Sequence, residues 1–207
     1  MAPEISTETI KLNILRMARK HFARDGLVGA SLKQIAEDSN VASSLINYHF
    51  TDREGLFHSC LRLFAVEKQE TINRILVQVK SKEEFRVRLE MFADEMIRSH
   101  LEDPDGFEII HREVKANNPK VLKLFKETIF QGFICVSAFL ESAKRIGILR
   151  KDVDPNIASM LLFTSICDTA RNDHLAQKFL GESLREKKWR DKVSQQIVDL
   201  FMKGIAS

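Results

Sequence analysis

Turn-forming residues are sparse in this chain, and their scarcity limits the folds open to it. Only 8 glycines and 4 prolines are spread over its 207 residues. A β-sandwich or a β-barrel needs turn signals at intervals of roughly ten residues. Apolar residues recur instead with the three- and four-residue spacing of amphipathic helices. The sequence therefore predicts an all-α fold of long helices, without a convincing strand or an internal repeat.

Capping residues and apolar periodicity together predict about nine helices. Thr7 is expected to cap the first helix, and Gly26 to follow it in a left-handed conformation. Ser31, Ser81 and Asp154 are expected to cap later helices. The helices are expected at about residues 7–25, 32–38, 42–49, 53–79, 81–101, from 104 onward, 119–146, 155–173 and 187–203. The polar stretch 174–188 indicates a loop or an irregular turn.

No apolar run in the sequence is long enough to cross a membrane. Residues 157–167 are among the longest, yet they contain polar residues and fall short of the roughly 20 apolar residues that a span needs. The first ten residues lack the basic segment and apolar core of a signal peptide. We therefore expect a cytoplasmic protein.

Residues 32–38 and 42–49, joined by three residues, have the dimensions of a helix-turn-helix. Asn40 lies in the connection and tolerates the positive φ that such a turn often requires. Two short helices bury too little surface on their own, so the first helix is expected to pack over them. The expected inward residues are Leu32, Ile35 and Ala36 on one helix, and Leu45, Ile46 and Tyr48 with Phe50 on the other.

The outward residues of this helix pair suit DNA. In a helix-turn-helix, the second helix presents its N-terminal residues to base edges in the major groove, which here are Ser43, Ser44 and Asn47. The other candidate contacts are to phosphates: Ser31 at a helix N-terminus, Tyr48, His49, Lys33 and Arg53. A structural alternative stays open, because similar helix pairs occur in proteins that bind no DNA and serines often only cap helices.

Charge in the N-terminal region is balanced. Residues 1–57 contain seven Lys and Arg and seven Asp and Glu, although the whole chain has a net charge of +3. Residues 11–24 carry five of these cations and no acid, and the five are expected on the side of the first helix opposite its apolar face. Phosphate attraction would therefore come mainly from this segment and from helix N-termini, which predicts modest nonspecific binding and a shallow dependence on salt.

The N-terminal segments SLKQIA (31–36), VASSLINYHF (41–50) and REGL (53–56) together resemble the DNA-binding signature of the TetR family. The resemblance covers about the first sixty residues. Asn40 stands where the family usually has glycine, and Arg53 stands where a lysine normally contacts phosphate. The resemblance implies a helix-turn-helix DNA-binding domain at residues 1–52 and a helical effector-binding and dimerisation domain at residues 53–207.

In function, the resemblance implies a repressor that binds a palindromic operator as a homodimer and is released by an unknown small-molecule effector. One alternative is an architectural or division-control DNA-binding protein on the same scaffold without a small-molecule ligand. Another is a helical enzyme whose N-terminal helices only resemble a DNA reader.

Residues 147–155 resemble the turn before the penultimate helix of the family, which with the last helix forms a four-helix dimer interface. Both of these helices carry broad apolar faces, although each face could also pack within one monomer. The expected interface residues are Ile157, Met160, Leu161, Thr164, Val193, Ile197, Leu200 and Phe201.

The central helices are rich in Phe and Met, which usually form a core but also line adaptable apolar pockets. An apolar or amphipathic effector is therefore the favoured ligand. The candidate pocket residues are Met91, Met96, Phe107, His111, Phe130 and Phe133.

No catalytic or metal-binding motif is evident, so neither an enzymatic activity nor a cofactor is expected. His100, His111 and His174 lie far apart and are expected to be surface or hydrogen-bonded core residues. The spacing of Cys60, Cys135 and Cys167 indicates buried, reduced thiols rather than a disulfide or a metal site.

Overall fold

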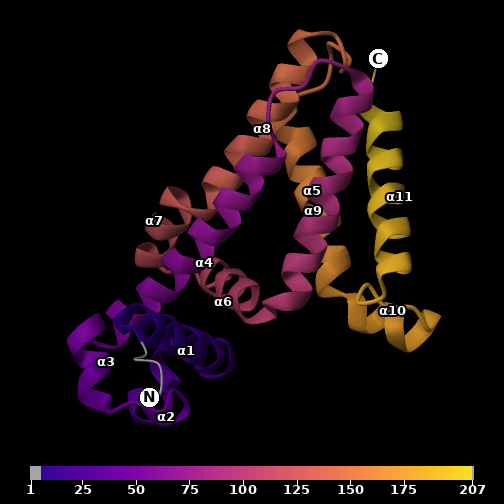
Figure 1. Cartoon of the computed structure of the whole chain (residues 1–207). Coiled ribbons are helices and arrows are strands. Elements are labelled where there is room, and N and C mark those ends of the chain that lie inside the picture. Colours follow the sequence, from indigo (N-terminus) through magenta and orange to yellow (C-terminus); the bar gives the residue numbers. More distant parts are fainter. Residues whose placement is uncertain (1–5, 207) are drawn as a thin grey trace. The chain divides into compact units, whose positions relative to one another are not determined.

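The computed structural model describes residues 6–206, except for the side chain of Lys120. Residues 1–5, which begin the segment compared with signal peptides, and Ser207 lie outside the described part. The regular secondary structure of the described residues is helical apart from one isolated bridge between Leu149 and Ala206, which confirms the all-α prediction (Figure 1). The helices are α1 (Thr7–Gly29), α2 (Leu32–Asp38), α3 (Ser43–Phe50), α4 (Arg53–Ile75), α5 (Lys82–Glu102), α6 (Pro104–Lys115), α7 (Pro119–Glu127), α8 (Ile129–Arg145), α9 (Pro155–Arg171), α10 (Asp173–Leu180) and α11 (Lys187–Ile205).

The chain divides into two compact units. The first contains Met1–Glu67 and Asp105–Thr128, and the second contains Lys68–Pro104 and Ile129–Ser207. Helices α6 and α7 thus belong largely to the same unit as α1, α2 and α3, and α4 contributes residues to both units. The predicted boundary at residue 52 separates a DNA-binding domain from an effector-binding domain by function rather than by compactness, and it stays a prediction.

The first unit is built around an apolar core to which α1 contributes one face. Ile14, Ala18 and Phe22 of α1 are fully buried, as the periodicity of this helix predicts. Phe22 meets the ring of Phe57 of α4 edge to face, with the ring centroids 5.0 Å apart. Ile35 of α2 and Ile46 of α3 complete the same cluster. Helix α1 therefore packs over the short helix pair, as predicted.

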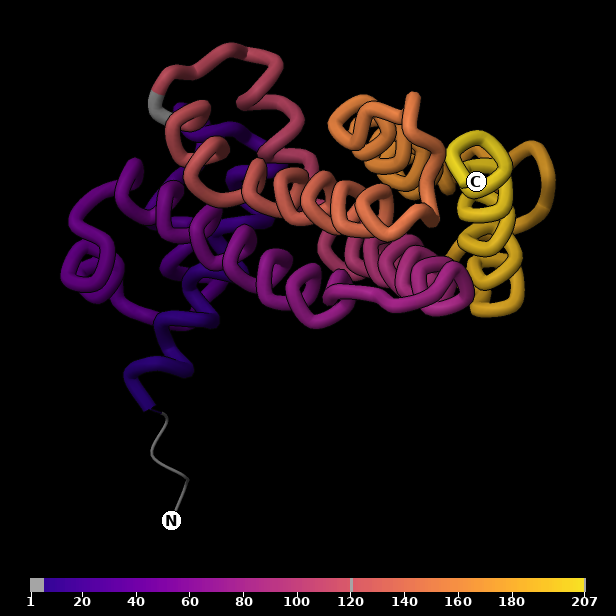
Figure 2. Tube along the Cα trace, turned by 90° about the horizontal axis from the view of Figure 1, so that it is seen from above, coloured from indigo at the N-terminus to yellow at the C-terminus, as the bar shows by residue number. Residues whose placement is uncertain are grey.

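The second unit is a helical bundle in which α5 lies beside α9 and α11, and α8 lies beside α9 (Figures 1 and 2). Phe85 of α5 stacks on Phe139 of α8 with ring centroids 5.1 Å apart. Phe92 of α5 meets Phe163 of α9 edge to face at 5.6 Å. These ring contacts join α5 to α8 and α9 within the bundle.

The sequence predicted three of the helix-capping residues correctly. The side chains of Ser31, Ser81 and Asp154 accept hydrogen bonds from backbone N–H groups in the first turns of α2, α5 and α9. Gly26 has a φ of 75° and kinks α1, although the helix assignment continues to Gly29. The cap of α1 is Ser6 rather than Thr7, because the Ser6 hydroxyl accepts from the backbone N–H of Thr9.

The structure differs from the prediction in three places. Two of these differences, the division of one expected helix and the additional helix α10, raise the expected nine helices to the series α1 to α11. Helix α4 ends at Ile75, where the Arg88 guanidinium donates to the Ile75 carbonyl oxygen at 2.9 Å. The expected helix at residues 119–146 is divided at Thr128, whose hydroxyl donates to the Leu124 carbonyl oxygen at 2.6 Å.

The third difference is α10, in a stretch where a loop or an irregular turn was expected. The buried carboxylate of Asp173 accepts hydrogen bonds from the Ser183 hydroxyl at 2.9 Å and from the Leu184 N–H at 2.6 Å. Gly181, with a φ of 72°, ends the helix. Asp173 therefore ties the start of α10 to the residues that follow this helix. The polarity of the stretch alone did not indicate this structure.

Candidate nucleic-acid interface

Helices α2 and α3 form the tight pair that the sequence predicts. The Ser31 hydroxyl accepts from the Gln34 N–H at 3.4 Å at the start of α2. Asn40 has a φ of 56°, and the Val41 N–H donates to the Ala36 carbonyl oxygen at 3.0 Å. Asn40 thus takes the positive φ expected of a residue in this turn.

The inner and outer sides of α3 differ in polarity. Ile46 and Phe50 are buried in the core, and Leu45 is half-buried. Ser43, Ser44 and Asn47 are exposed, and Tyr48 is 81% exposed. The expectation that Tyr48 closes the core is wrong, because two residues along a helix turn a side chain to nearly the opposite side from Ile46.

The serines at the start of α3 do not act as caps. Ala42 occupies the N-cap position, and no side chain caps this end of the helix. The hydroxyls of Ser43 and Ser44 make no hydrogen bond with another residue in the described part of the chain. The backbone N–H groups of Ser43 and Ser44 and both hydroxyls are therefore available to an external partner such as a phosphate or a base edge, whereas the Leu45 N–H donates to the Ala42 carbonyl oxygen.

The remaining candidate contacts flank α3. Lys33 is exposed, with its ammonium nitrogen 3.9 Å from a carboxylate oxygen of Glu37. Arg53 is half-buried and donates to the carbonyl oxygens of Val28 at 2.7 Å and Ala30 at 3.4 Å. The half-buried His49 ring meets the Tyr48 ring edge to face at 5.1 Å.

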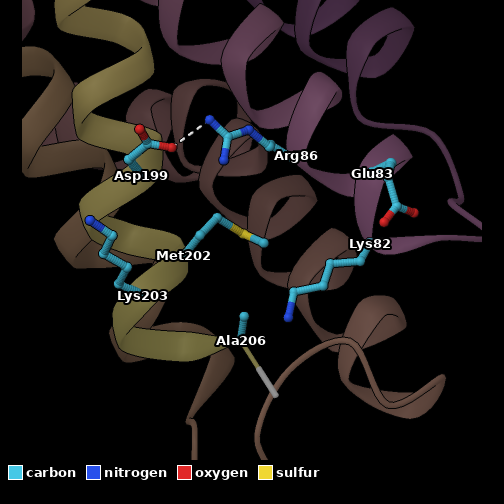
Figure 3. Close-up of a pocket in the computed structure, with 7 residues that line it drawn as sticks. All are labelled: Lys82, Glu83, Arg86, Asp199, Met202, Lys203 and Ala206. Atoms are coloured by element: carbon cyan, nitrogen blue, oxygen red, sulfur yellow. Dashed lines mark ion pairs between the residues drawn. The ribbon is translucent and has the colours of Figure 1, made fainter.

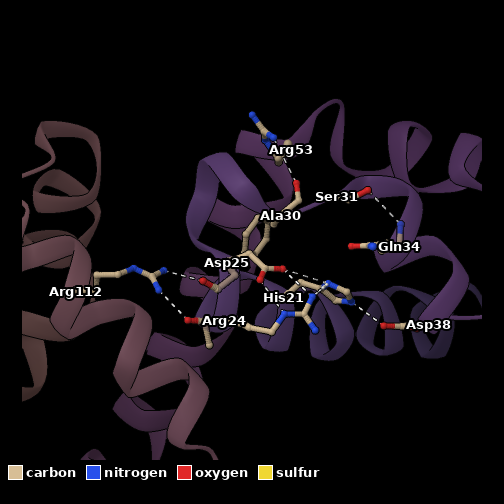
Figure 4. A network of polar contacts seen from close by, with 11 residues as sticks. His21, Arg24, Asp25, Ala30, Ser31, Gln34, Asp38, Arg53 and Arg112 are labelled. Atoms are coloured by element: carbon tan, nitrogen blue, oxygen red, sulfur yellow. Dashed lines mark hydrogen bonds and ion pairs between the residues drawn. The ribbon is translucent and has the colours of Figure 1, made fainter.

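A polar network that the sequence analysis missed joins α1 to α2 (Figure 4). The Nε2 atom of buried His21 lies 2.7 Å from a carboxylate oxygen of Asp38, and its Nδ1 atom lies 3.1 Å from the Arg24 guanidinium. Arg24 also forms two hydrogen bonds with Asp25, and these lower the pKa of the Asp25 carboxyl. His21 thus fixes the end of α2 that leads into the turn before α3.

Arg112 of α6 is a second contact that the sequence analysis missed. Its guanidinium donates to the carbonyl oxygens of Ala23 at 2.8 Å and Phe22 at 2.7 Å, close to the kink at Gly26 (Figure 4). These carbonyls lie where the kink interrupts the helical hydrogen bonding. Arg112 therefore binds the end of the straight part of α1, and about ninety residues separate the partners in sequence.

The cationic face expected of α1 is smaller than predicted. Arg19 is only 7% exposed and lies over the ring of Phe64, with its guanidinium carbon 5.5 Å from the ring centroid. Arg24 is engaged by Asp25. Arg16 and Lys20 are exposed. The expectation that all five cations lie opposite the apolar face is wrong for Arg19.

The six candidate effector residues fall into both units. In the first unit, Phe107 meets the Phe64 ring edge to face at 4.8 Å, and His111 is exposed. In the second unit, Phe130 and Phe133 stack with centroids 5.3 Å apart. Met96 is buried there, whereas Met91 is 50% exposed.

The second unit also has two open surface grooves. One, of about 440 Å³, lies between the first turn of α5 and the end of α11, and the ion pair of Arg86 with Asp199 lies within it (Figure 3). The other, of about 310 Å³, is lined by α8 and the start of α9. None of the six candidate effector residues lines either groove.

Helices α9 and α11 each have an apolar outer face besides the face that they bury in the bundle. On α9, Ile157, Met160 and Thr164 are exposed, and Leu161 is 57% exposed. On α11, Leu200 is 68% exposed, and Val193, Ile197 and Phe201 are half-buried. These side chains are additional to the buried residues of the same helices, such as Leu162 and Val198.

The thiols are free. Cys60 is buried and donates to the Leu15 carbonyl oxygen at 3.4 Å, while Cys135 and Cys167 are partly buried. Burial raises the pKa of the Cys167 thiol to about 11, so this group stays protonated and unreactive at neutral pH.

Within residues 6–206, no helix is long and apolar enough to cross a membrane. The same residues contain no cluster of three His, Cys, Asp or Glu side chains placed to hold a metal ion.

His100 of α5 is buried, and burial lowers its pKa from 6.5 to about 4, with Arg171 and Lys68 acting in the same direction. The unfolded chain therefore binds this proton first as the pH falls. The stability that comes from keeping His100 neutral is present above pH 6.5 and is lost between pH 6.5 and about 4. The difference in pKa corresponds to a loss of roughly 3 kcal/mol.

Urea denaturation at several pH values tests this prediction. The free energy of unfolding of the wild-type chain should fall more steeply below pH 6.5 than that of His100→Gln. Replacement of the exposed His111 by Gln serves as the matched control and should leave the steep fall intact. Parallel pH profiles for the wild type and His100→Gln would contradict the prediction.

Comparison with known proteins agrees with this geometry. Residues 14–60 match the family model of bacterial regulatory proteins of the tetR family, and the match covers α2, α3 and most of α1. Residues 14–60 thus form a TetR-type DNA-binding domain, and the enzyme alternative is rejected because the matched family consists of regulatory proteins.

Similarity also extends over most of the chain, in sequence to one repressor and in fold to solved structures. The chain is 22% identical over 195 residues to the HTH-type transcriptional repressor NicS of Pseudomonas putida, and the match covers 93% of this chain and 91% of that protein. The fold is similar to that of the transcriptional regulator FadR from Bacillus subtilis in complex with stearoyl-CoA, with a TM-score of 0.74, 16% identity and coverage of 93% of this chain and 98% of that one. The fatty acid degradation regulator FadR from Bacillus halodurans gives a TM-score of 0.74 with 16% identity, over 94% of this chain and 95% of that one.

Proposed function

We propose that this chain is a homodimeric repressor that binds a palindromic operator through α3 and is released by a small apolar or amphipathic molecule. The observation that carries the proposal is the outer side of α3, where Ser43, Ser44, Asn47 and Tyr48 are exposed on a helix anchored by buried Ile46 and Phe50. A repressor would act in the cytoplasm, where its DNA target lies.

In this proposal Ser43, Ser44 and Asn47 contact base edges, and the other candidate residues contact phosphates. Arg53 would have to exchange its carbonyl partners at Val28 and Ala30 for a phosphate, or it would act by holding this loop in place. The phosphate-contacting residues are Ser31, Lys33, Tyr48, His49 and Arg53.

The proposed dimer rests on the outer faces of α9 and α11. Reading a palindrome requires two recognition helices about 34–36 Å apart, which a two-fold dimer provides. Leu161 and Leu200 are large apolar side chains that nothing in the described chain covers fully. A second copy of the chain would bury both faces.

The effector proposal rests on the aromatic and Met side chains of the helices after α4. Phe130 and Phe133 stack on each other, and Phe133 lies 6.2 Å from the ring of Phe163, a cluster that suits an apolar ligand. The FadR structure from Bacillus subtilis contains stearoyl-CoA, an amphipathic molecule. An effector would favour a state in which the spacing of the two recognition helices does not fit the operator. Helix α4, which contributes residues to both units, would transmit this change.

Replacing Asn47 and Tyr48 together with alanine tests the DNA-binding role. Both side chains are exposed, so the fold and the dimer should persist, while operator affinity should fall by at least about tenfold because one base contact and one phosphate contact are lost. Operator DNA selected from a random pool, titrated in gel-shift assays, gives the affinity, and analytical ultracentrifugation gives the oligomeric state. Gln177→Ala on α10 is the control, and unchanged affinity in the double variant would refute the proposal.

A further inference from the structure

The outer side of α3 carries no cation. Ser43–Phe50 contains neither Lys nor Arg, and its exposed side chains are two hydroxyls, one amide and one phenol. The commonest specific contact in the major groove is made by an Arg or Lys side chain that donates hydrogen bonds to both O6 and N7 of a guanine. No residue of α3 can make that contact. The nearest cations in sequence, Lys33 and Arg53, belong to α2 and α4.

Asn47 is the α3 side chain with the chemistry to form two hydrogen bonds with one base. It is exposed and makes no side-chain hydrogen bond with another described residue, although its backbone carbonyl accepts from the Thr51 N–H at 3.0 Å. That backbone bond caps the end of α3 and fixes the residue in helical conformation. The amide is therefore held on a rigid backbone and free to pair outward.

The neighbouring polar groups discriminate less between bases. A serine hydroxyl both donates and accepts, so Ser43 and Ser44 can match several base edges. The Tyr48 phenol has the same ambiguity. His49 is half-buried against the Tyr48 and Phe50 rings, with centroids at 5.1 Å and 6.0 Å. Asn47 is the exposed residue among these that carries a donor and an acceptor side by side on one planar amide, as pairing with a single base edge requires.

We propose that Asn47 determines the sequence specificity of this regulator by pairing with one adenine in each operator half-site. The amide N–H would donate to adenine N7, and the amide carbonyl would accept from the adenine N6 amino group. The base-specific hydrogen bonds of α3 would thus recognise an A·T pair in each half-site and would not require a guanine. This inference rests on the proposed function, because it requires that α3 enters the major groove.

Selection of bound duplexes from a random pool, performed in parallel with the full-length wild type, Asn47→Ala, Asn47→Asp and Lys33→Ala, tests the inference. The wild type should enrich a palindrome with an A·T pair in each half-site, and Asn47→Ala should lose the preference at that pair alone. Asn47→Asp has nearly the same shape but only accepts, so its preference should move toward cytosine, whose N4 group donates. Lys33→Ala is the control for a phosphate contact and should keep the wild-type sequence preference.

Affinity measurements on the selected operator complete the test. Replacing the adenine of that pair with 7-deazaadenine removes N7 and leaves Watson–Crick pairing intact. The wild type should lose about 5- to 100-fold in affinity, and Asn47→Ala should bind both duplexes equally.

The outcomes separate the inference from the proposed function. If a palindrome is enriched but the preference lost in Asn47→Ala concerns a G·C pair, or no preference changes, the inference is wrong and the proposed function stands. If 7-deazaadenine weakens the wild type and Asn47→Ala equally, Asn47 does not read that base. If the wild type enriches no sequence, the proposed function fails and the inference fails with it.

Discussion

Replacing Leu161 of α9 and Leu200 of α11 with aspartate is expected to convert the proposed dimer into monomers and to weaken operator binding by about 10²–10⁴-fold. Both side chains are more than half exposed in the single chain, at 57% and 68%, so the fold should tolerate the change. In a dimer, each copy would place two unpaired carboxylates in an apolar interface, at a large desolvation cost. A monomer would then lose the high effective concentration with which the second recognition helix binds its half-site.

Sedimentation equilibrium and titration of a palindromic operator measure the two effects separately. Val87→Asp on α5 is the matched control, because Val87 is also an exposed apolar residue of the same unit and lies outside the proposed interface. A dimeric double-aspartate variant with full operator affinity would exclude α9 and α11 as the interface. Monomers with full affinity would instead show that dimerisation is not required for binding.

The second large effect is expected from Phe57→Ala, which should reduce the stability of the first unit by about 3–5 kcal/mol. Phe57 is fully buried and makes an edge-to-face contact with Phe22, so truncation leaves a cavity and removes an aromatic pair where α1 meets α4. Operator binding should be lost under conditions in which this unit is unfolded.

Chemical denaturation followed by two probes distinguishes the units. The single tryptophan of the chain, Trp189, lies in α11 and reports on the second unit, whereas far-ultraviolet circular dichroism reports on all helices. Phe57→Ala should shift an early part of the dichroism transition and leave the fluorescence transition in place. Phe179→Ala, which removes a 71% exposed ring, should change stability by less than about 0.5 kcal/mol, and equal effects of the two variants would contradict the prediction.

Features with local causes were predictable from the sequence. Ser31 and Asp154 cap helices because their side chains reach N–H groups two or three residues later, and Asn40 takes a positive φ because the turn requires it. Helical spacing likewise predicts α3 and its outward Ser43 and Asn47, since it decides which side chains can face the core.

Features that depend on distant partners were not predictable. Arg19 is on α1 among other cations, and only the fold brings Phe64 beneath it. The pairing of His21 with Asp38 and of Arg112 with the α1 carbonyls likewise depends on tertiary packing. The sequence leaves two roles open for Tyr48 because a tyrosine suits both an interface and a core, and its exposure in the structure distinguishes them.

The contact of Arg112 with α1 has a consequence for protein engineering. The helices that carry the helix-turn-helix belong to a compact unit that also includes Asp105–Thr128. A chimera that joins residues 1–52 to the remainder of another regulator would leave behind the guanidinium that binds the Phe22 and Ala23 carbonyls. We expect a functional hybrid to require two transplanted segments, the N-terminal DNA-binding helices and their own α6 and α7.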